Sequence, residues 1–223
     1  MLFGEVVELD RRERGWSQVR AIRDGYTGWI VDTSVAPAAI AASHRVSQPS
    51  GLVFARPDIK SPLLQRFYQG SLLALEPVDG VFHQVCGGGF IHYRHVSARF
   101  VVDSDPVAIG MRFVGTPYLW GGRTCDGIDC SALVQTALQA CGIDCLRDTG
   151  DQRAAFGHAV ISGEPRCGDL VFFPGHVGMM IDGAQLLHAN AFWMTTIVEP
   201  LAAVIDRLRP SVDQPILAVV RPA

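Results

Sequence analysis

The sequence is poor in charge: charged residues make up 18% of its 223 residues, and the formal net charge is −3. This balance gives no reason to expect nucleic acid or an anionic membrane as a partner. No apolar run approaches the roughly 20 residues of a membrane span. A secretion signal is also missing from the first residues, MLFGEVVELDRRERGW, which alternate like a strand and then turn charged. We therefore expect a cytoplasmic protein.

The cysteines lack the spacing of a structural zinc site. Neither Cys125 and Cys130 nor Cys141 and Cys145 have the two-residue gap of a zinc knuckle. An even number of cysteines favours disulfides in a small secreted protein, but the length and the missing signal favour free thiols here. We expect neither a metal nor a cofactor. The six positions are Cys86, Cys125, Cys130, Cys141, Cys145 and Cys167.

Apolar residues are abundant, at 48% of the chain, which is typical of a folded globular protein. Two segments, 1–44 and 45–103, contain short alternating runs separated by Gly and Pro. Short strands with tight turns indicate small β-barrels. The charged sequence DRRERG is expected to form a hairpin turn. The expected strands are FGEVVEL, WSQVRAI and GYTGWIV in the first segment, and GLVFARPD, SLLALEPV, VFHQVCG and FIHYRHV in the second.

The composition changes in the third segment, 104–223. Asp105 and Pro106 form a helix start, and apolar residues at helical spacing follow Cys130 until Gly142 ends that helix. A helix followed by an antiparallel sheet indicates an α+β domain. The expected strands of this sheet are DLVFF, HVGMMID, AQLLHAN, TTIVEPL and ILAVVRP.

Cys130 lies where this helix begins. If Asp129 caps the helix, unpaired N–H groups and the helix dipole should lower the pKa of the thiol. A nucleophilic cysteine also needs a base, and His176 opens a strand after Pro174 and Gly175. His188 ends the next run, so a hairpin about residues 182–183 would bring both histidines to one end of the sheet. His188 would then orient His176.

Each of these residues also has an ordinary structural interpretation. A cysteine in an apolar helix is usually a small core residue, and a histidine at a strand end is usually hydrogen-bonded for structural reasons. Asp129 can be a simple N-cap and Tyr118 an aromatic packing residue. Taken singly, the residues leave these alternatives open.

The sequence of the whole region decides between the catalytic and the structural interpretations. The segments GTPYLWGGRTCDGIDCSALVQTAL, PRCGDLVFF, GHVGMMID and LLHAN, within about residues 107–200, resemble the NlpC-type cell-wall cysteine peptidases, a papain-like family. The resemblance implies a papain-like domain over 104–223, with helices packed on an antiparallel sheet. It implies that Cys130 is the nucleophile, His176 the general base and acid, and His188 the orienting residue. One departure is Ala132, which stands where the family usually has Gly.

The resemblance extends to the other segments. GW followed by GYTGWIV resembles a bacterial SH3-like module over 1–44, and 45–103 resembles a second, divergent one. In relatives built this way the barrel restricts the enzyme to short peptides with a free N-terminal L-alanine. Asp129 and Ser131 then resemble the residues that hold the ammonium group, with Glu5 and Tyr26 as candidates from the barrel. Tyr118 resembles the family's tyrosine beside the nucleophile, which helps to bind substrate.

The implied function is a cysteine endopeptidase that hydrolyses the γ-D-glutamyl–diamino acid bond of small murein peptides and releases L-Ala-D-Glu. With no export signal, the expected role is recycling of cell-wall peptides. Two alternatives remain: an endopeptidase or amidase that acts on intact peptidoglycan, and a catalytically dead module that binds peptide or glycan. The preferred diamino acid and the oligomeric state are not predicted.

Overall fold

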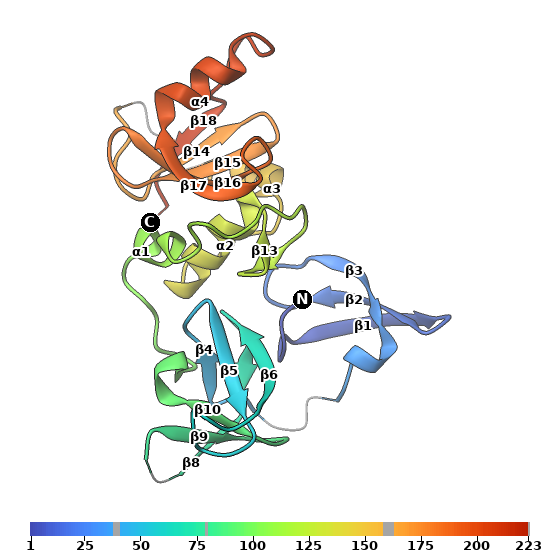
Figure 1. Cartoon of the computed structure of the whole chain (residues 1–223). Coiled ribbons are helices and arrows are strands. Elements are labelled where there is room, and N and C mark those ends of the chain that lie inside the picture. The colour runs from blue at the N-terminus through green and yellow to red at the C-terminus, as the bar shows by residue number, and fades with distance from the viewer. Residues whose placement is uncertain (38–40, 79, 158–162, 223) are drawn as a thin grey trace. The chain divides into compact units, whose positions relative to one another are not determined.

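The computed structural model describes residues 1–37, 41–78, 80–157 and 163–222. The chain divides into two units, Met1–Val101 and Val102–Ala223, and each is described by itself (Figure 1). The sequence places the start of the third segment at residue 104. No helix in the described ranges is long and apolar enough to cross a membrane.

The first unit is built from short antiparallel strands in three sheets, with orders β1-β2-β3, β6-β5-β10-β9-β8 and β11-β4-β7. The strands are β1 (Val7–Glu13), β2 (Trp16–Ala21), β3 (Thr27–Val31), β4 (His44–Val46), β5 (Ser50–Phe54), β6 (Leu63–Tyr68), β7 (Leu72–Leu73), β8 (Leu75–Pro77), β9 (Phe82–Val85), β10 (Phe90–His92) and β11 (Val96–Ala98). Two short 3-10 helices are η1 (Asp32–Ser34) and η2 (Tyr93–His95). The main apolar cluster is Val46, Val53, Phe67, Leu73, Leu75, Val85, Ile91 and Val96.

The prediction that DRRERG forms a hairpin turn is wrong in extent. Strand β1 continues through these charged residues to Glu13, and only Arg14 and Gly15 form the turn, with φ of 51° and 83°. Positive φ at both central residues is the two-residue turn that matches the twist of a hairpin. The charges are tolerated because β1 is an edge strand with mostly exposed side chains.

The second unit contains helices and one five-stranded antiparallel sheet of order β17-β16-β15-β14-β18. Its helices are α1 (Pro106–Met111), α2 (Cys130–Ala140), α3 (Thr149–Ala155) and α4 (Leu201–Leu208). Its strands are β12 (Arg123–Thr124), β13 (Gly127–Ile128), β14 (Leu170–Phe173), β15 (His176–Met180), β16 (Gln185–Asn190), β17 (Thr195–Pro200) and β18 (Ala218–Val220).

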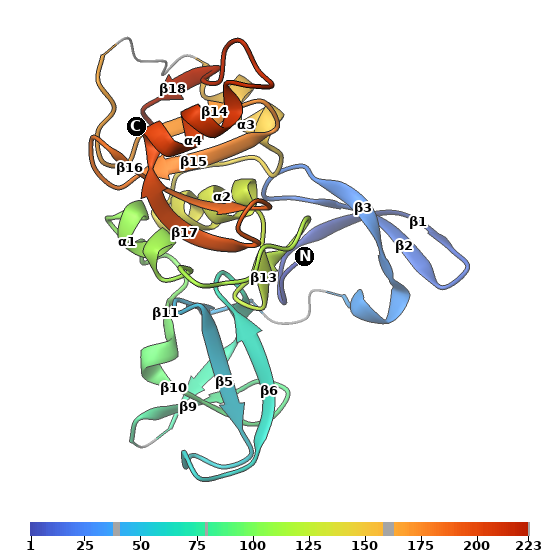
Figure 2. The same cartoon turned by 45° about the horizontal axis from the view of Figure 1, so that its top comes forward.

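Helices cover both faces of this sheet, with α2 on one side and α4 on the other (Figures 1 and 2). Alternate residues of β15 face the two helical layers. Val177 and Met179 pack in the cluster that contains residues of α2. Met180 packs on the other side, with Leu201 and Val204 of α4. Every residue of α2 is buried. A sheet with two helical layers explains why its strands are apolar almost throughout.

Two helices are absent from the expectations drawn from the sequence. Helix α3 has only 7 residues. Helix α4 directly follows β17, and the strand predicted over TTIVEPL extends into its first residue. The strand ends at Pro200 and the helix begins at Leu201. A proline at that junction has no N–H to give to a strand and is well placed before a first helical turn.

Strand β18 is tied to the start of β14 by a buried carboxylate. Asp169 accepts two hydrogen bonds from Arg221, both at 2.7 Å, and one from the backbone N–H of Arg166 at 2.8 Å. Arg221 follows β18, and the contact joins residues far apart in the chain. Asp169 therefore holds the sheet together, in agreement with the packing role that its position at a strand start indicates.

Two consecutive glycines shape the loop that leads into α2. Gly121 has φ of 80°, in the region that favours glycine. A Cβ added at Gly122 would lie 2.4 Å from the carbonyl oxygen of Gly127 and 2.9 Å from that of Leu119. The carbonyl of Gly122 also accepts the backbone N–H of Asp129 at 3.2 Å. The missing side chain at 122 thus lets the loop close onto the start of α2.

Gly122→Ala should therefore lower the free energy of unfolding by about 1–3 kcal/mol, the usual cost of overpacking. The two oxygens belong to the backbone, so no side chain can turn away to make room. Gly150→Ala is the matched control, because a Cβ there meets nothing within 4 Å and lies in α3. The control should be neutral or more stable by up to about 1 kcal/mol. Urea unfolding measures both, and equal midpoints would contradict this account.

Candidate active site

Cys130 is the first residue of α2, at the position expected from the sequence. Asp129 has extended backbone, and its Oδ1 accepts the backbone N–H of Ala132 at 2.8 Å, so it is the helix cap. An apolar helix held at its first turn by a short acidic residue places the next side chain, the thiol, at the helix tip.

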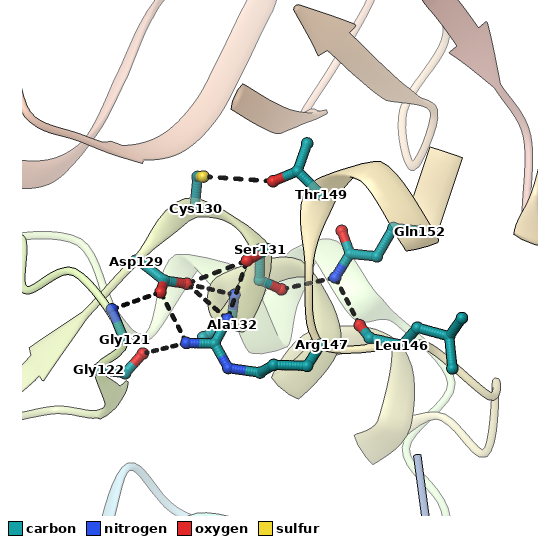
Figure 3. A network of polar contacts seen from close by, with 10 residues as sticks. All are labelled: Gly121, Gly122, Asp129, Cys130, Ser131, Ala132, Leu146, Arg147, Thr149 and Gln152. Atoms are coloured by element: carbon teal, nitrogen blue, oxygen red, sulfur yellow. Dashed lines mark hydrogen bonds and ion pairs between the residues drawn. The ribbon is translucent and has the colours of Figure 1, made fainter. Parts of the chain in front are cut away.

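The sulfur lies where three elements meet. Sγ of Cys130 is 3.8 Å from Oγ1 of Thr149, the first residue of α3 (Figure 3). The backbone N–H groups of Val177 in β15 and of Ser131 also donate to it. The residue is only 7% exposed.

Burial raises the pKa of the Cys130 thiol, while the donors Val177, Thr149 and Ser131 act to lower it. The lowered pKa expected from the helix tip is therefore wrong. Helix-end charges contribute about 0.3–1 kcal/mol, less than one pKa unit, whereas burial shifts a pKa by up to about 3–5 units. Burial prevails, and the sulfur keeps its proton until a base removes it.

The two predicted histidines lie side by side. The turn at Pro174 and Gly175, with φ of 67° at the glycine, joins β14 to β15 so that His176 opens the strand opposite Phe173. Nε2 of His176 lies 2.8 Å from Nδ1 of His188 in β16. The expected meeting of both histidines at one end of the sheet is confirmed. Val177, whose amide contacts the sulfur of Cys130, is the next residue after His176.

The pKa of His176 is lowered to about 3, mainly by burial and also by the neighbouring His188, while Glu199 opposes the shift. The pKa of His188 is also lowered, again mainly by burial. Both imidazoles are therefore neutral near pH 7. A neutral imidazole beside a thiol can accept its proton, so the protonation state suits a general base.

Glu199 is the third member of a series of hydrogen-bonded groups that begins with His176 and His188, and it was not predicted from the sequence. Its Oε1 lies 2.9 Å from Nε2 of His188, and Arg207 of α4 forms two hydrogen bonds with the same carboxylate. Burial acts to raise the pKa of Glu199, but Arg207, His188 and Trp193 together hold it below its usual value. The signal in the sequence is one acidic residue in an otherwise uncharged run, TTIVEPL.

Tyr118 lies close to the nucleophile. Burial raises the pKa of its phenol, and the charges of Cys130 and Asp129 raise it further, while Arg147 opposes them. These interactions place the phenol within electrostatic reach of both residues. With its pKa raised, the hydroxyl is protonated near pH 7 and can donate a hydrogen bond.

Asp129 and Ser131, the predicted amine-binding residues, share a partner that the sequence did not reveal (Figure 3). Arg147 donates to Oδ1 and Oδ2 of Asp129 at 3.0 and 2.6 Å and to Oγ of Ser131 at 2.9 Å. The backbone N–H of Gly121 also donates to Asp129 at 2.8 Å. Both carboxylate oxygens are thus already engaged, and an incoming ammonium group would have to share them.

The remaining candidates from the sequence are two residues of the other unit. Glu5 and Tyr26 belong to the first unit, where Glu5 accepts the backbone N–H of Leu2 at 2.8 Å and Tyr26 donates its own to Asp24 at 3.1 Å. All six cysteines fall in the described ranges and are free thiols. Among those residues, no group of His, Cys, Asp or Glu could hold a metal ion.

Comparisons with known proteins match both parts of the chain. A profile of the NlpC/P60 family matches residues 115–201, which contain Cys130, His176 and His188. A profile described as the bacterial dipeptidyl-peptidase SH3 domain matches residues 1–35.

Individual relatives cover most of the chain. The chain is 30% identical over 212 residues to the gamma-D-glutamyl-L-lysine dipeptidyl-peptidase of Bacillus subtilis. The aligned region covers 85% of this chain and 71% of that protein. The chain is 26% identical over 213 residues to dipeptidyl-peptidase 6 of Lysinibacillus sphaericus, with coverage of 85% and 79%. The crystal structure of an NlpC/P60 family protein from Bacillus cereus has a TM-score of 0.83 and 21% identity, and covers 100% of this chain and 81% of that one.

The solved structure has the same fold, so the predicted α+β class, with a papain-like domain after an SH3-like module, is confirmed. A relative of 30% identity covers most of both chains, and the matched region contains the helix-tip cysteine and the paired histidines. The chain belongs to the NlpC/P60 family of cysteine peptidases.

Proposed function

We propose that this cell-wall peptidase hydrolyses the γ-D-glutamyl–diamino acid bond of small murein peptides that carry a free N-terminal L-alanine. The product is the dipeptide L-Ala-D-Glu. Two relatives named gamma-D-glutamyl-L-lysine dipeptidyl-peptidase support both the bond and the dipeptide product. The matched SH3 profile, described by its dipeptidyl-peptidase family, supports the same specificity.

The observation that carries the proposal is the junction of α2 and β15. The backbone N–H of Val177 donates to the sulfur of Cys130, and the preceding residue, His176, is hydrogen-bonded to His188. A thiol at a helix tip, a neutral imidazole on the adjoining strand and a second imidazole behind it form the arrangement that nucleophilic catalysis requires.

In the proposed mechanism His176 removes the proton of Cys130 as the sulfur attacks the carbonyl carbon of the γ-D-glutamyl bond. Backbone N–H groups at the start of α2, which have no partner within the helix, stabilise the oxyanion, with Tyr118 close by. His176 then gives the proton to the departing amine, which leaves a thioester. Water loses a proton to His176, attacks the thioester and releases L-Ala-D-Glu with the thiol restored.

Recognition of the amine falls to Asp129 and Ser131 in this proposal. An ammonium group taken out of water needs an anion and hydrogen-bond acceptors. The carboxylate of Asp129 and the hydroxyl of Ser131 offer both, and they share them with Arg147. A peptide without the free amine would leave this site without its charged ligand.

The proposed role is recycling of murein peptides inside the cell. The alternative is an endopeptidase or amidase that acts on intact peptidoglycan, and a similar protein of Haemophilus influenzae is named a probable endopeptidase NlpC homolog. Stem peptides of the intact wall have no free N-terminal amine, because L-alanine is attached to the glycan there. The amine requirement therefore separates the two roles.

Mass spectrometry of the products of L-Ala-γ-D-Glu-meso-diaminopimelate is the direct test. The wild-type protein should release L-Ala-D-Glu, and it should leave the N-acetylated peptide and intact sacculi uncut. Cys130→Ala should release no product, while Cys167→Ala, which changes an exposed thiol, should keep wild-type activity. Product from Cys130→Ala would remove the basis of the proposal. Cleavage of sacculi or of the acetylated peptide would favour the wall-cleaving alternative.

The pH dependence of kcat/KM provides a second test. Protonation of His176 would abolish the base, but burial lowers the pKa of His176 to about 3. The base therefore stays unprotonated as the pH falls, and is lost only as the pH approaches that value. We expect kcat/KM for the tripeptide to stay constant within about twofold between pH 7 and pH 5, where an ordinary histidine, of pKa about 6.5, would become mostly protonated. A decline centred near pH 6.5 would contradict a buried neutral base.

A further inference from the structure

A row of four polar groups runs from the imidazole of His176 to a helix on the far side of the sheet. Nδ1 of His188 faces Nε2 of His176 at 2.8 Å, and Nε2 of His188 faces Oε1 of Glu199 at 2.9 Å. Arg207 then donates to Oε1 from Nη1 at 3.0 Å and to Oε2 from Nη2 at 2.5 Å. Every link is within hydrogen-bond distance, so the state of one member constrains the next.

The charge of Glu199 determines which way the protons point. An ionised carboxylate can only accept hydrogen bonds, so Nε2 of His188 must carry a proton. In a neutral ring Nδ1 of His188 is then an acceptor and takes the Nε2 proton of His176. The neutral ring of His176 is left with an unprotonated Nδ1, the nitrogen that can remove a proton from the thiol.

Asn190 is a competing neighbour, because its Nδ2 lies 3.0 Å from Nε2 of His188 and an amide nitrogen that donates there would favour the opposite tautomer. The hydrogen bond to the ionised Glu199 is charge-assisted and roughly twice as strong as one between neutral groups, so Glu199 prevails. The orientation of that amide is set by the backbone N–H of Trp193, which donates to Oδ1 of Asn190 at 2.8 Å. The acceptor for the proton on Nε2 is therefore Glu199.

Arg207 keeps Glu199 ionised and in place. The guanidinium group of Arg207 lies over two aromatic rings, with its carbon 4.1 Å from the ring centre of Phe192 and 5.8 Å from that of Trp193. Its two hydrogen bonds occupy both oxygens of the carboxylate, which is almost fully buried. A buried carboxylate without such a partner would take up a proton and could then donate instead of accept.

We propose that Glu199, held by Arg207, is a positioning residue that sets the tautomer of His188 and, through it, that of His176. Glu199 contacts His188 and Arg207, so it acts through the second imidazole and not on the reacting atoms. Its effect on hydrolysis is to keep Nδ1 of His176 free of a proton. The inference rests on the proposed function only for its kinetic readout, because the tautomers themselves can be observed without substrate.

Glu199→Gln is the discriminating change, since it keeps the shape and removes the charge. Arg207 will hold the amide oxygen, so the amide NH2 will face His188 and donate to Nε2. Both rings should then switch to protonation at Nδ1. We expect kcat to fall about 10- to 100-fold, the range seen when a metal-binding histidine loses the outer partner that orients it, with KM unchanged within about twofold. Glu199→Asp keeps the charge and should retain more activity than Glu199→Gln.

The spectroscopic readout is the ¹⁵N chemical shift of the imidazole nitrogens in histidine-labelled protein, assigned with His176→Asn and His188→Asn. In the wild type both rings should carry the proton on Nε2, and in Glu199→Gln both should carry it on Nδ1. A second variant is Arg207→Gln, which removes the partner of Glu199. Its control is Arg209→Gln, because Arg209 directly follows α4 and pairs with Asp206 in an exposed contact. Only the Arg207 change should alter the ring spectra.

A wild-type His188 protonated at Nδ1 would overturn the proposal, whatever the stability of the variants. Wild-type spectra and kcat in a folded Glu199→Gln protein would overturn it too. If the wild type does not cleave the tripeptide, the proposed function fails by itself, and the ring spectra still decide the role of Glu199.

Discussion

The start of α2 depends on one buried ion pair. Arg147 and Asp129 are each 7% exposed in their side chains and lie 2.6 Å apart. Removing one partner of such a pair typically costs about 3–5 kcal/mol, because the other charge is left buried without compensation. The same carboxylate caps the helix through Ala132 and holds the loop through Gly121. The position of the nucleophile is therefore a consequence of how this one carboxylate is satisfied.

Burial of the sulfur decides the resting chemistry of the site. The helix tip and the backbone donors favour a thiolate, but the loss of water around Cys130 outweighs them and the pKa of the thiol rises. Loss of water acts on His176 in the opposite sense, and its pKa falls. At neutral pH the two groups are therefore a neutral thiol and a neutral base. Charge then develops only when the proton moves, so the groups that control the proton's path matter more than a preformed ion pair.

Sequence reasoning reached the local features and missed the partners that come from distant elements. Cys130 follows a capping residue, and His176 follows a Pro-Gly turn. A few neighbouring residues were therefore enough to predict that Cys130 begins a helix and that His176 begins a strand. Glu199 sits in a run assigned as a single strand, and its partner lies on α4, a helix that the pattern did not reveal. Nothing in the composition around Arg147 indicates that it reaches back 18 residues to Asp129. Ion pairs across a fold have no local period to detect.

The two buried carboxylates of the site follow one physical rule. Asp129 and Glu199 each form an ion pair with an arginine, Arg147 and Arg207 respectively. Asp129 fixes the helix that carries the sulfur, and Glu199 contacts the second imidazole. What remains free to exchange protons is the set of neutral groups between them: the thiol and the two rings. An ionised Glu199 at the end of this set gives the hydrogen bonds through His188 to His176 one direction, which a neutral group there would leave undefined.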